Sequence, residues 1–358
     1  MDLEVSLFEN ILKNPFFLAS GPLSYSAEGI IKADRAGAGA IVTKTIRQKA
    51  AENPTPHIIE SDNNTLINAE KWSDLPPERW IKKEIPRVND ISAMLIASIG
   101  HTAAEVENYL GPVEEAGADG FELVSYDRNT LLPMVEKARS ITNKPVLVKV
   151  SPNWDSPVET ALEALEAGGS GVTVMDSLGP VLRIDIEEES PLLGSENGTG
   201  WLSGKAINPL MLRYVAQIAS STEKPIIATG GISTAEDAME ALMAGASATG
   251  LCSAPILKGV GHFETLRQNM KDLMDSKGYE SPSEVTGAAL KNLTDKERSN
   301  ELSFKFAENK CINCGRCVTV CSYDARSLKD GEMELSNERC RHCGLCVSVC
   351  PTEALTHE

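Results

Sequence analysis

The cysteines carry the clearest chemistry in this chain, because eight of the nine fall within residues 301–358. They form two copies of one pattern, Cys-x2-Cys-x2-Cys-x3-Cys, and a proline follows the second copy directly. The spacing is typical of a pair of [4Fe–4S] clusters, since three closely spaced thiolates converge on one cluster while the fourth reaches the other. We therefore expect one cluster on Cys311, Cys314, Cys317 and Cys350, and a second on Cys340, Cys343, Cys346 and Cys321.

Two other uses of these cysteines are less consistent with the sequence. Zinc sites rarely carry the third Cys-x2-Cys step and the Cys-Pro ending. Disulfides need an oxidising compartment, and the N-terminus lacks the basic start and cleavage site of a secretory signal. The first copy departs from the pattern only at Ser322, where proline is usual. The cysteines thus indicate a protein that passes electrons one at a time.

Composition narrows the class of protein further. The chain has 358 residues, 42% of them hydrophobic, and a formal net charge of −17. No apolar stretch approaches the ~20 residues of a membrane span. So acidic a chain is poorly suited to nucleic acid, because phosphate contacts need clustered Lys and Arg. We expect a cytoplasmic protein with neither a membrane nor a nucleic acid as partner.

Short apolar runs alternate with amphipathic segments eight times, and several segments end in Ala-Gly, a common helix stop. Eight strand–helix units predict an α/β fold, a (β/α)8 TIM barrel, over residues 1–280. A polar helical linker is expected over 281–305, and a small α+β domain with the clusters over 306–358. The expected strands cover 16–21, 40–46, 94–100, 120–125, 145–151, 171–177, 224–231 and 248–254.

Two longer segments, 47–90 and 178–208, interrupt the alternation after the second and sixth strands. Connections that follow barrel strands lie on the face where barrel active sites form. Gly230-Gly231 ends the seventh strand and Gly250 lies in the eighth. Glycine lets backbone N–H groups approach a phosphate closely, so we expect a phosphate site after strands seven and eight.

Residues 15–255 resemble the dihydroorotate dehydrogenase superfamily, whose members are FMN-binding barrels. A barrel followed by a bacterial-type ferredoxin domain is similar to the C-terminal part of dihydropyrimidine dehydrogenase and to the catalytic subunit of its bacterial relatives. The stretches that carry the resemblance are NPFFLASGP (14–22), VTKTI (42–46), LVKVSP (147–152), DS (176–177), WLSGKAINPLMLRYV (201–215) and IATGGISTAEDAMEALMAGAS (227–247).

The resemblance implies FMN as cofactor and names the residues that contact it. Lys149 would reach the pyrimidine edge of the flavin, where a cation stabilises the anionic reduced form. A buried lysine without a ligand would be an unpaired charge, so we expect Lys44 and Lys149 to pair with one. Cys252 is expected to be a small buried residue, not a redox group. The implied FMN-contacting residues are Ala19, Ser20, Gly21, Lys44, Thr45, Lys149, Ser177, Ser203, Gly204, Gly230, Gly231, Cys252 and Ser253.

The sequence departs from the family on the substrate side. Relatives bind a planar cyclic amide through asparagines, and Val124 and Asp176 replace two of them here. An ionised aspartate only accepts hydrogen bonds, so it prefers a cationic or donor-rich ligand. We expect an altered substrate pocket that includes Asn68, Asn129 and Asp176. The candidates for acid–base and catalytic roles are Asp127, Tyr126 and Lys149.

The sequence therefore predicts an FMN-dependent iron–sulfur oxidoreductase that acts on CH–CH groups of a small, cyclic substrate. It has no strand–GxGxxG–helix fingerprint, so nicotinamide would bind a separate subunit. The resemblance suggests an FAD- and NAD(P)-binding partner subunit or a ferredoxin, in a homodimer or heteromer. One alternative is an electron-relay subunit without substrate chemistry. Another is a flavin enzyme that reduces uridine in tRNA, which the acidic composition disfavours.

Overall fold

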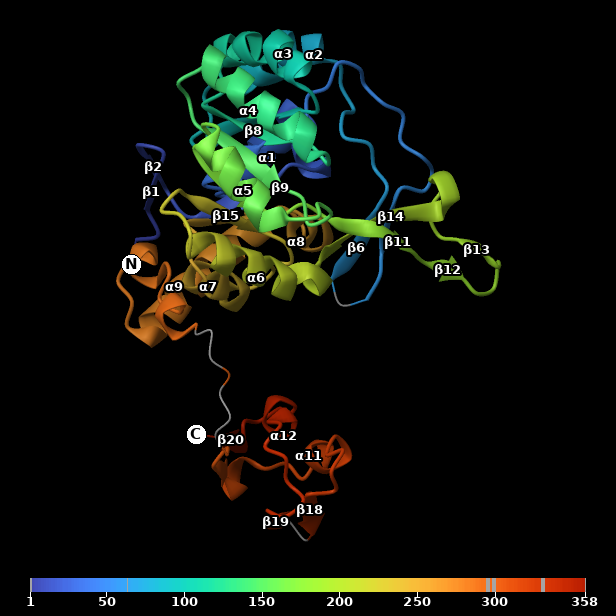
Figure 1. Cartoon of the computed structure of the whole chain (residues 1–358), viewed down its shortest axis with the longest axis vertical. Coiled ribbons are helices and arrows are strands. Elements are labelled where there is room, and N and C mark those ends of the chain that lie inside the picture. The colour runs from blue at the N-terminus through green and yellow to red at the C-terminus, as the bar shows by residue number, and fades with distance from the viewer. Residues whose placement is uncertain (1, 63, 294–296, 298–300, 330–331, 358) are drawn as a thin grey trace. The chain divides into compact units, whose positions relative to one another are not determined.

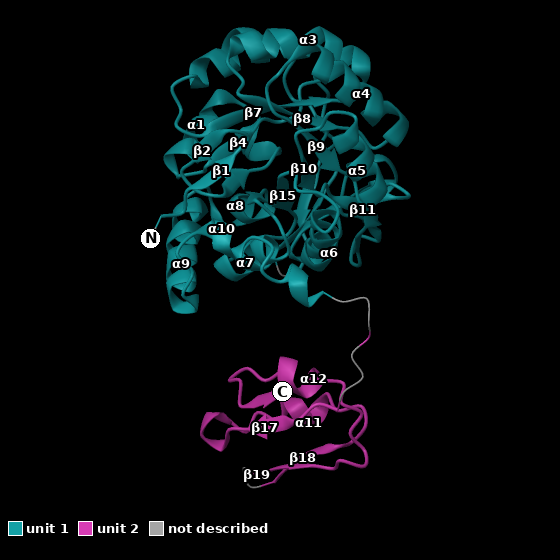
Figure 2. Ribbon diagram, turned by 60° about the vertical axis from the view of Figure 1, so that its left-hand side comes forward, with its two compact units in different colours: residues 1–293 teal, residues 294–358 magenta. Residues whose placement is uncertain are grey.

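A computed structural model describes residues 2–62, 64–293, 297, 301–329 and 332–357. The chain divides into two compact units, Met1–Leu293 and Thr294–Glu358 (Figure 2). The first unit extends beyond the predicted end of the barrel at residue 280. After α10 (Pro282–Val285), the N–H groups of Gly287 and Ala289 donate to the carbonyls of Leu242 and Met243, which ties this segment to the barrel.

The first unit contains a closed, parallel eight-stranded barrel, which confirms the predicted fold class. The strands follow one another around the barrel in chain order, and the last pairs with the first. They are β3 (Phe16–Leu18), β4 (Ala40–Val42), β7 (Met94–Gly100), β8 (Gly120–Val124), β9 (Val146–Val150), β10 (Gly171–Val174), β15 (Ile226–Thr229) and β16 (Ala248–Leu251).

Helices surround the barrel, as the periodicity predicted (Figure 2). The strands are buried almost throughout, because helices cover one face and the barrel core the other. The helices of the first unit are α1 (Ala27–Arg35), α2 (Pro77–Arg79), α3 (Ala103–Ala116), α4 (Arg128–Ile141), α5 (Pro157–Glu166), α6 (Asn208–Ala219), α7 (Ala235–Met243), α8 (Ser253–Lys258), α9 (His262–Lys277) and α10.

A hairpin closes the end of the barrel opposite the candidate site. Its strands are β1 (Val5–Leu7) and β2 (Asn10–Leu12). Leu7 and Leu12 pack into the barrel interior with Phe17, Ile96 and Leu147. This apolar packing leaves the carboxyl ends of the strands as the open face.

The two long insertions meet in one antiparallel sheet, which the sequence did not predict. The sheet has the order β11-β14-β6-β5, so one insertion supplies β5 and β6 and the other supplies β11 and β14 (Figure 1). The short pair β12 (Ile184–Asp185) and β13 (Ser190–Pro191) extends from it. The four strands are β5 (Ile58–Glu60), β6 (Thr65–Asn68), β11 (Leu178–Leu182) and β14 (Thr199–Gly204).

The second unit is built from two similar halves. Each half has a short helix that follows a glycine in the left-handed region, Gly315 with φ 69° and Gly344 with φ 78°. The two helices are α11 (Arg316–Thr319) and α12 (Leu345–Ser348). The strand pairs are β17 (Phe304–Phe306) with β20 (Leu355–His357), and β18 (Arg326–Lys329) with β19 (Glu332–Leu335).

None of the helices in the described part of the chain combines the length and apolar character that crossing a membrane requires.

Candidate active site and cluster sites

A cavity of about 720 Å³ lies at the carboxyl ends of the barrel strands, beneath the sheet that the insertions form. Its volume falls in the upper part of the range for cofactor and small-molecule sites, which is roughly 300–1,000 Å³. Every residue implied to contact FMN lines this cavity. Three residues predicted for substrate binding or catalysis, Asn68, Tyr126 and Asp176, line it as well. The fold thus collects side chains from nearly every strand end into one space.

Glycines shape one end of the cavity. Gly204 has φ 85° and Gly231 has φ 75°, which is the left-handed region that glycine adopts readily. A Cβ on Gly231 would lie 2.6 Å from the carbonyl oxygen of Gly204, so the loops after β14 and β15 touch through their backbones. The hydroxyls of Ser203 and Ser253 lie 3.0 Å apart and join the same region to the start of α8. Backbone and hydroxyl donors that line the cavity at this end suit a phosphate group.

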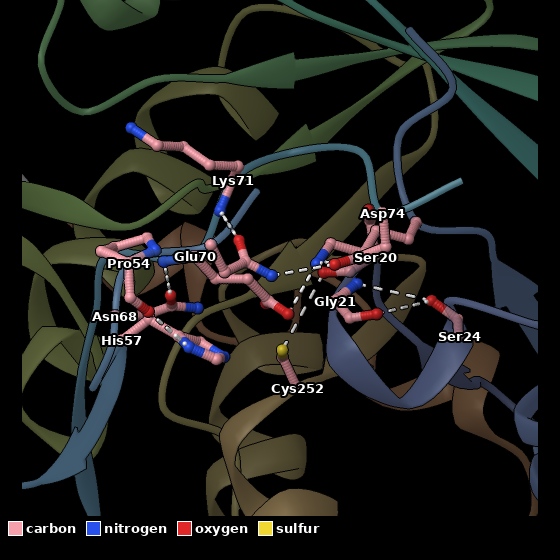
Figure 3. A network of polar contacts seen from close by, with 12 residues as sticks. Ser20, Gly21, Ser24, Pro54, His57, Asn68, Glu70, Lys71, Asp74 and Cys252 are labelled. Carbon is pink, nitrogen blue, oxygen red and sulfur yellow. Dashed lines mark hydrogen bonds and ion pairs between the residues drawn. The ribbon is translucent and has the colours of Figure 1, made fainter. Parts of the chain in front are cut away.

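Lys44 lines the cavity and contacts two carboxylates. Its Nζ is 2.6 Å from Glu70 Oε1 and also contacts Asp74. Both acids come from the first insertion, and Figure 3 shows them with the Ser20–Gly21 segment. The neighbouring Asn68 accepts a 2.5 Å hydrogen bond from the Glu70 N–H. This leaves the side-chain amide of Asn68 as the group that can donate to a ligand.

Lys149, on β9, is paired with Glu122 on β8. The Nζ lies 3.5 Å from Glu122 Oε1, and the other carboxylate oxygen accepts a 2.8 Å hydrogen bond from Thr173. Burial lowers the pKa of Lys149, but the carboxylates of Glu122 and Asp176 outweigh it and hold the pKa above its ordinary value. Lys149 is therefore charged at neutral pH. The protein itself supplies carboxylates to both buried lysines, and these are partners that the sequence did not name. Pairing of the two lysines with a bound ligand stays a prediction.

Cys252 follows β16 and lines the cavity. Its Sγ lies 3.9 Å from the carbonyl oxygen of Ser20. Figure 3 shows the Cys252 side chain directed toward the Ser20–Gly21 segment. A Cβ on Gly21 would come within 2.7 Å of this sulfur, so the segment 19–21 packs closely against the thiol. Burial raises the pKa of Cys252 to about 11. The side chain is thus a neutral thiol at physiological pH, which agrees with the passive role that the sequence suggested.

Aromatic side chains form the opposite wall of the cavity. The rings of Trp72 and Tyr126 meet edge to face at 4.8 Å between centroids, and Tyr126 is parallel to Trp201 at 6.1 Å. Trp72 and Trp201 come from the two insertions, and Tyr126 follows β8. Burial and the charge of Asp176 both raise the pKa of Tyr126 above its ordinary value. Its hydroxyl therefore stays protonated and can donate a hydrogen bond.

Two predicted site residues lie elsewhere. Asp127 is the N-cap of α4, and its carboxylate accepts a 2.8 Å hydrogen bond from the N–H of Asn129. Both residues are exposed, and neither lines the cavity. Sequence position alone could not distinguish these loop residues from Tyr126, because all three follow the same strand. The local helix-capping bond takes up the carboxylate that was considered for acid–base chemistry.

His101 lines the cavity, although the sequence did not single it out. Its ring lies edge to face against Trp72 at 5.0 Å, and its buried Nδ1 has no hydrogen-bond partner among the described residues. Burial and the neighbouring Arg47 lower its pKa below the ordinary value. The signal was present, since His101 directly follows the third strand, and residues at that end of barrel strands are commonly catalytic.

The second unit brings together one of the two predicted sets of cysteines. A small cavity is lined by Cys311, Cys314, Cys317 and Cys350, the set expected for the first cluster. Among the described residues, no three His, Cys, Asp or Glu side chains are arranged to hold a single metal ion. Four cysteine sulfurs around a four-iron cluster need a wider arrangement.

Backbone N–H groups point at the cluster cysteines. Ala325 N lies 3.3 Å from Cys321 Sγ, and Ala354 N lies 3.2 Å from Cys350 Sγ, at equivalent positions of the two halves. Burial raises the pKa of these two thiols, but several backbone hydrogen bonds together outweigh it, and both pKa values are lowered. Thiolates are the form that binds iron.

Comparison with known proteins agrees with this geometry. The family model for dihydroorotate dehydrogenase matches residues 117–274, and that for a 4Fe-4S dicluster domain matches residues 305–354. The catalytic subunit of dihydroorotate dehydrogenase B (NAD(+)) from Pyrococcus abyssi is 34% identical over 307 residues, covering 81% of this chain and 99% of the relative. The chain belongs to the dihydroorotate dehydrogenase family.

A bacterial relative covers more of the chain. The NAD-dependent dihydropyrimidine dehydrogenase subunit PreA of Escherichia coli K12 is 29% identical over 358 residues, covering 90% of this chain and 86% of the relative. This chain is accordingly an FMN-containing oxidoreductase of the family, with two [4Fe–4S] clusters through which electrons pass.

The hydrogen-bond donors that line the cavity suit FMN. The glycine loops suit a phosphate, and the buried Thr229 Oγ1, which lines the cavity, lacks a hydrogen-bond partner among the described residues.

Proposed function

We propose that this chain oxidises or reduces a CH–CH bond of a small cyclic substrate bound in the barrel cavity, and exchanges the electrons with a partner subunit through its clusters. One observation carries the proposal. The cavity brings every implied FMN-contacting residue together with an aromatic wall and with polar side chains that no cofactor role explains. A planar ring would gain apolar contact from Trp72, Tyr126 and Trp201 while the polar groups orient it.

Different residues of the chain would bind different parts of FMN. The glycines after β14 and β15, with Ser203 and Ser253, would hold the FMN phosphate. Lys149 would place its charge beside the flavin ring, held in position by Glu122. Bound FMN supplies a carrier that exchanges two electrons with a substrate and single electrons with iron–sulfur clusters.

Tyr126 and His101 are the groups that we propose for proton transfer. The hydroxyl of Tyr126 stays protonated, so it suits a donor role. His101 is neutral near pH 7 because its pKa is lowered, and its buried Nδ1 has no partner among the described residues. General acid–base groups of this kind contribute roughly 10²–10⁴-fold to rate. Asp127 is not proposed, because its carboxylate caps α4.

The pocket is proposed to differ from a pyrimidine site. Val124 presents an apolar surface to the cavity. Asp176 presents a carboxylate, one oxygen of which accepts a 2.8 Å hydrogen bond from the Ser177 N–H. A cyclic amide needs paired donors and acceptors, and leaving its polar groups unpaired reduces binding strongly.

A partner that handles nicotinamide is also proposed. The Pyrococcus abyssi and Escherichia coli relatives are named as a catalytic subunit of an NAD(+) enzyme and as an NAD-dependent dehydrogenase subunit. This chain has no dinucleotide fingerprint of its own. An FAD- and NAD(P)-binding subunit, or a ferredoxin, would then complete the electron path, and the chain would work as a homodimer or heteromer.

The test is to photoreduce the anaerobic protein and to mix it with uracil, orotate and a panel of unsaturated cyclic compounds. Rapid reoxidation of the flavin by one compound class would support the enzyme and name its substrate type. Reoxidation only by one-electron acceptors would support the alternative, an electron-relay subunit. The volume and polar lining of the cavity favour the enzyme, since a relay has no need for a substrate space.

A further inference from the structure

Both buried lysines in the cavity have carboxylate partners. Lys44 lies between Glu70, 2.6 Å away, and Asp74. Lys149 lies 3.5 Å from Glu122 and is also influenced by the charge of Asp176. The exposed fractions of the Lys44 and Lys149 side chains are only 5% and 9%, so water screens these charges weakly. Three carboxylates are thus paired with two ammonium groups, and Asp176 adds a fourth carboxylate to the lining of the cavity.

The other charged side chains around the cavity do not offset this excess of negative charge. Arg47 is paired with Glu105 at 2.7 Å, and Lys205 is paired with Asp237. Lys49 and Lys71 are exposed. Figure 3 shows the Lys71 side chain directed away from Glu70 and Asp74. Exposed charges at the mouth of a cavity are screened by water and salt, so the interior remains acidic.

The aromatic wall adds an independent preference for positive charge. Ring faces carry a negative quadrupole that attracts cations within roughly 6 Å. The aromatic wall already makes one cation–π contact, because the guanidinium carbon of Arg47 lies 5.6 Å from the centre of the Trp72 ring. Tyr126 and Trp201 line the same cavity as Asp176. A positively charged ring could thus meet an aromatic face and a carboxylate together.

We propose that the substrate is a positively charged, planar nitrogen heterocycle, with Asp176 as its counter-ion and the rings of Tyr126 and Trp201 as its platform. This inference rests on the proposed function, since it names the substrate class of the same cavity. A ring that carries a carboxylate would be excluded. Lys44 and Lys149, the buried cations that could receive it, already face protein carboxylates.

Three probes of similar shape test the charge preference. They are 1-methylnicotinamide, which is a cation, nicotinamide, which is neutral, and nicotinate, which is an anion. Their dissociation constants for the anaerobically purified holoprotein are measured from changes in the flavin absorption spectrum. We expect the cation to bind at least tenfold more tightly than the neutral probe and the anion to bind most weakly. Equal affinities, undetectable binding of the cation or a preference for nicotinate would overturn the proposal.

Asp176→Asn is the decisive variant, because it keeps the shape of the side chain and removes its charge. We expect the preference for the cation over the neutral probe to fall about tenfold, while the affinity for nicotinamide changes less than threefold. Asp155→Asn is the matched control, since Asp155 is exposed and does not line the cavity. If both variants behave alike, the effect is not local to Asp176 and the proposal fails.

FMN content and cluster reduction are measured on the same samples. A protein without flavin, or with flavin that cannot reduce the clusters, would contradict the proposed function itself. A competent flavin protein without charge preference would contradict only the substrate class.

Discussion

Replacing Lys149 with methionine should destabilise the barrel strongly. The Glu122 side chain is 1% exposed, and its Oε1 has Lys149, 3.5 Å away, as its ion-pair partner but no hydrogen bond from the described residues. Methionine has similar length but no charge, so it would leave a buried carboxylate unpaired. At 3.5 Å and an effective dielectric constant of about 20, the lost attraction is about 5 kcal/mol. Breaking a buried ion pair typically costs about 3–5 kcal/mol, and we expect a loss in that range.

Urea unfolding followed by tryptophan fluorescence measures this loss selectively. All four tryptophans lie between residues 72 and 201, within the first unit, so the signal reports on the barrel alone. The measurement is made on FMN-saturated and on FMN-stripped protein, since lost cofactor binding would destabilise only the saturated form.

The double variant Lys149→Met with Glu122→Gln separates charge from packing. It should recover most of the stability, because the unpaired carboxylate is gone. The reasoning would be refuted if Lys149→Met alone cost less than about 1 kcal/mol, or if the double variant were as unstable as the two single losses added together.

Three further predictions concern proton transfer, the cluster domain and the cofactor loops. In the wild-type protein, kcat/KM should fall as pH drops through a pKa below the ordinary ~6.5 of histidine, because protonation removes the proton acceptor at His101. The variant His101→Gln should flatten this acidic limb. An unchanged pH profile would exclude His101 as the acid–base group. Cys350→Ser should lower the iron content by about half while the FMN content stays constant, since one four-iron cluster loses a ligand; iron and flavin analysis of the same sample decides this. The variant Gly204→Ala should weaken FMN retention and destabilise the barrel by about 1–3 kcal/mol. The cause is that φ at this position is 85° and the new Cβ would lie 2.3 Å from the Asn64 carbonyl oxygen. Normal FMN retention in a dialysis assay would contradict the role of this turn.

The two buried lysines show where reasoning from the chain was incomplete. An inward-facing lysine needs a compensating charge, which singles out Lys44 and Lys149 on their predicted strands. It could not name the partners, because Glu70 and Asp74 lie in an insertion and Glu122 lies on the neighbouring strand. Only the closed barrel and the insertion sheet bring these carboxylates to the ammonium groups.

Local patterns in the chain were enough to predict the barrel, the cluster domain and the redox cofactors of this protein. Strand and helix periods are local properties of the sequence, so eight alternations predict a barrel. The spacing of the eight cysteines likewise predicts which of them bind each cluster. The tertiary structure decided which side chains share the cavity. It placed Asp127 on a helix cap, brought His101 to the site, and joined Trp72 and Trp201 through a sheet between two distant insertions. The last two outcomes depend on closure of the barrel and on long-range pairing of the insertions, which leave no periodic signal in the chain, whereas the Asp127 cap is a local hydrogen bond.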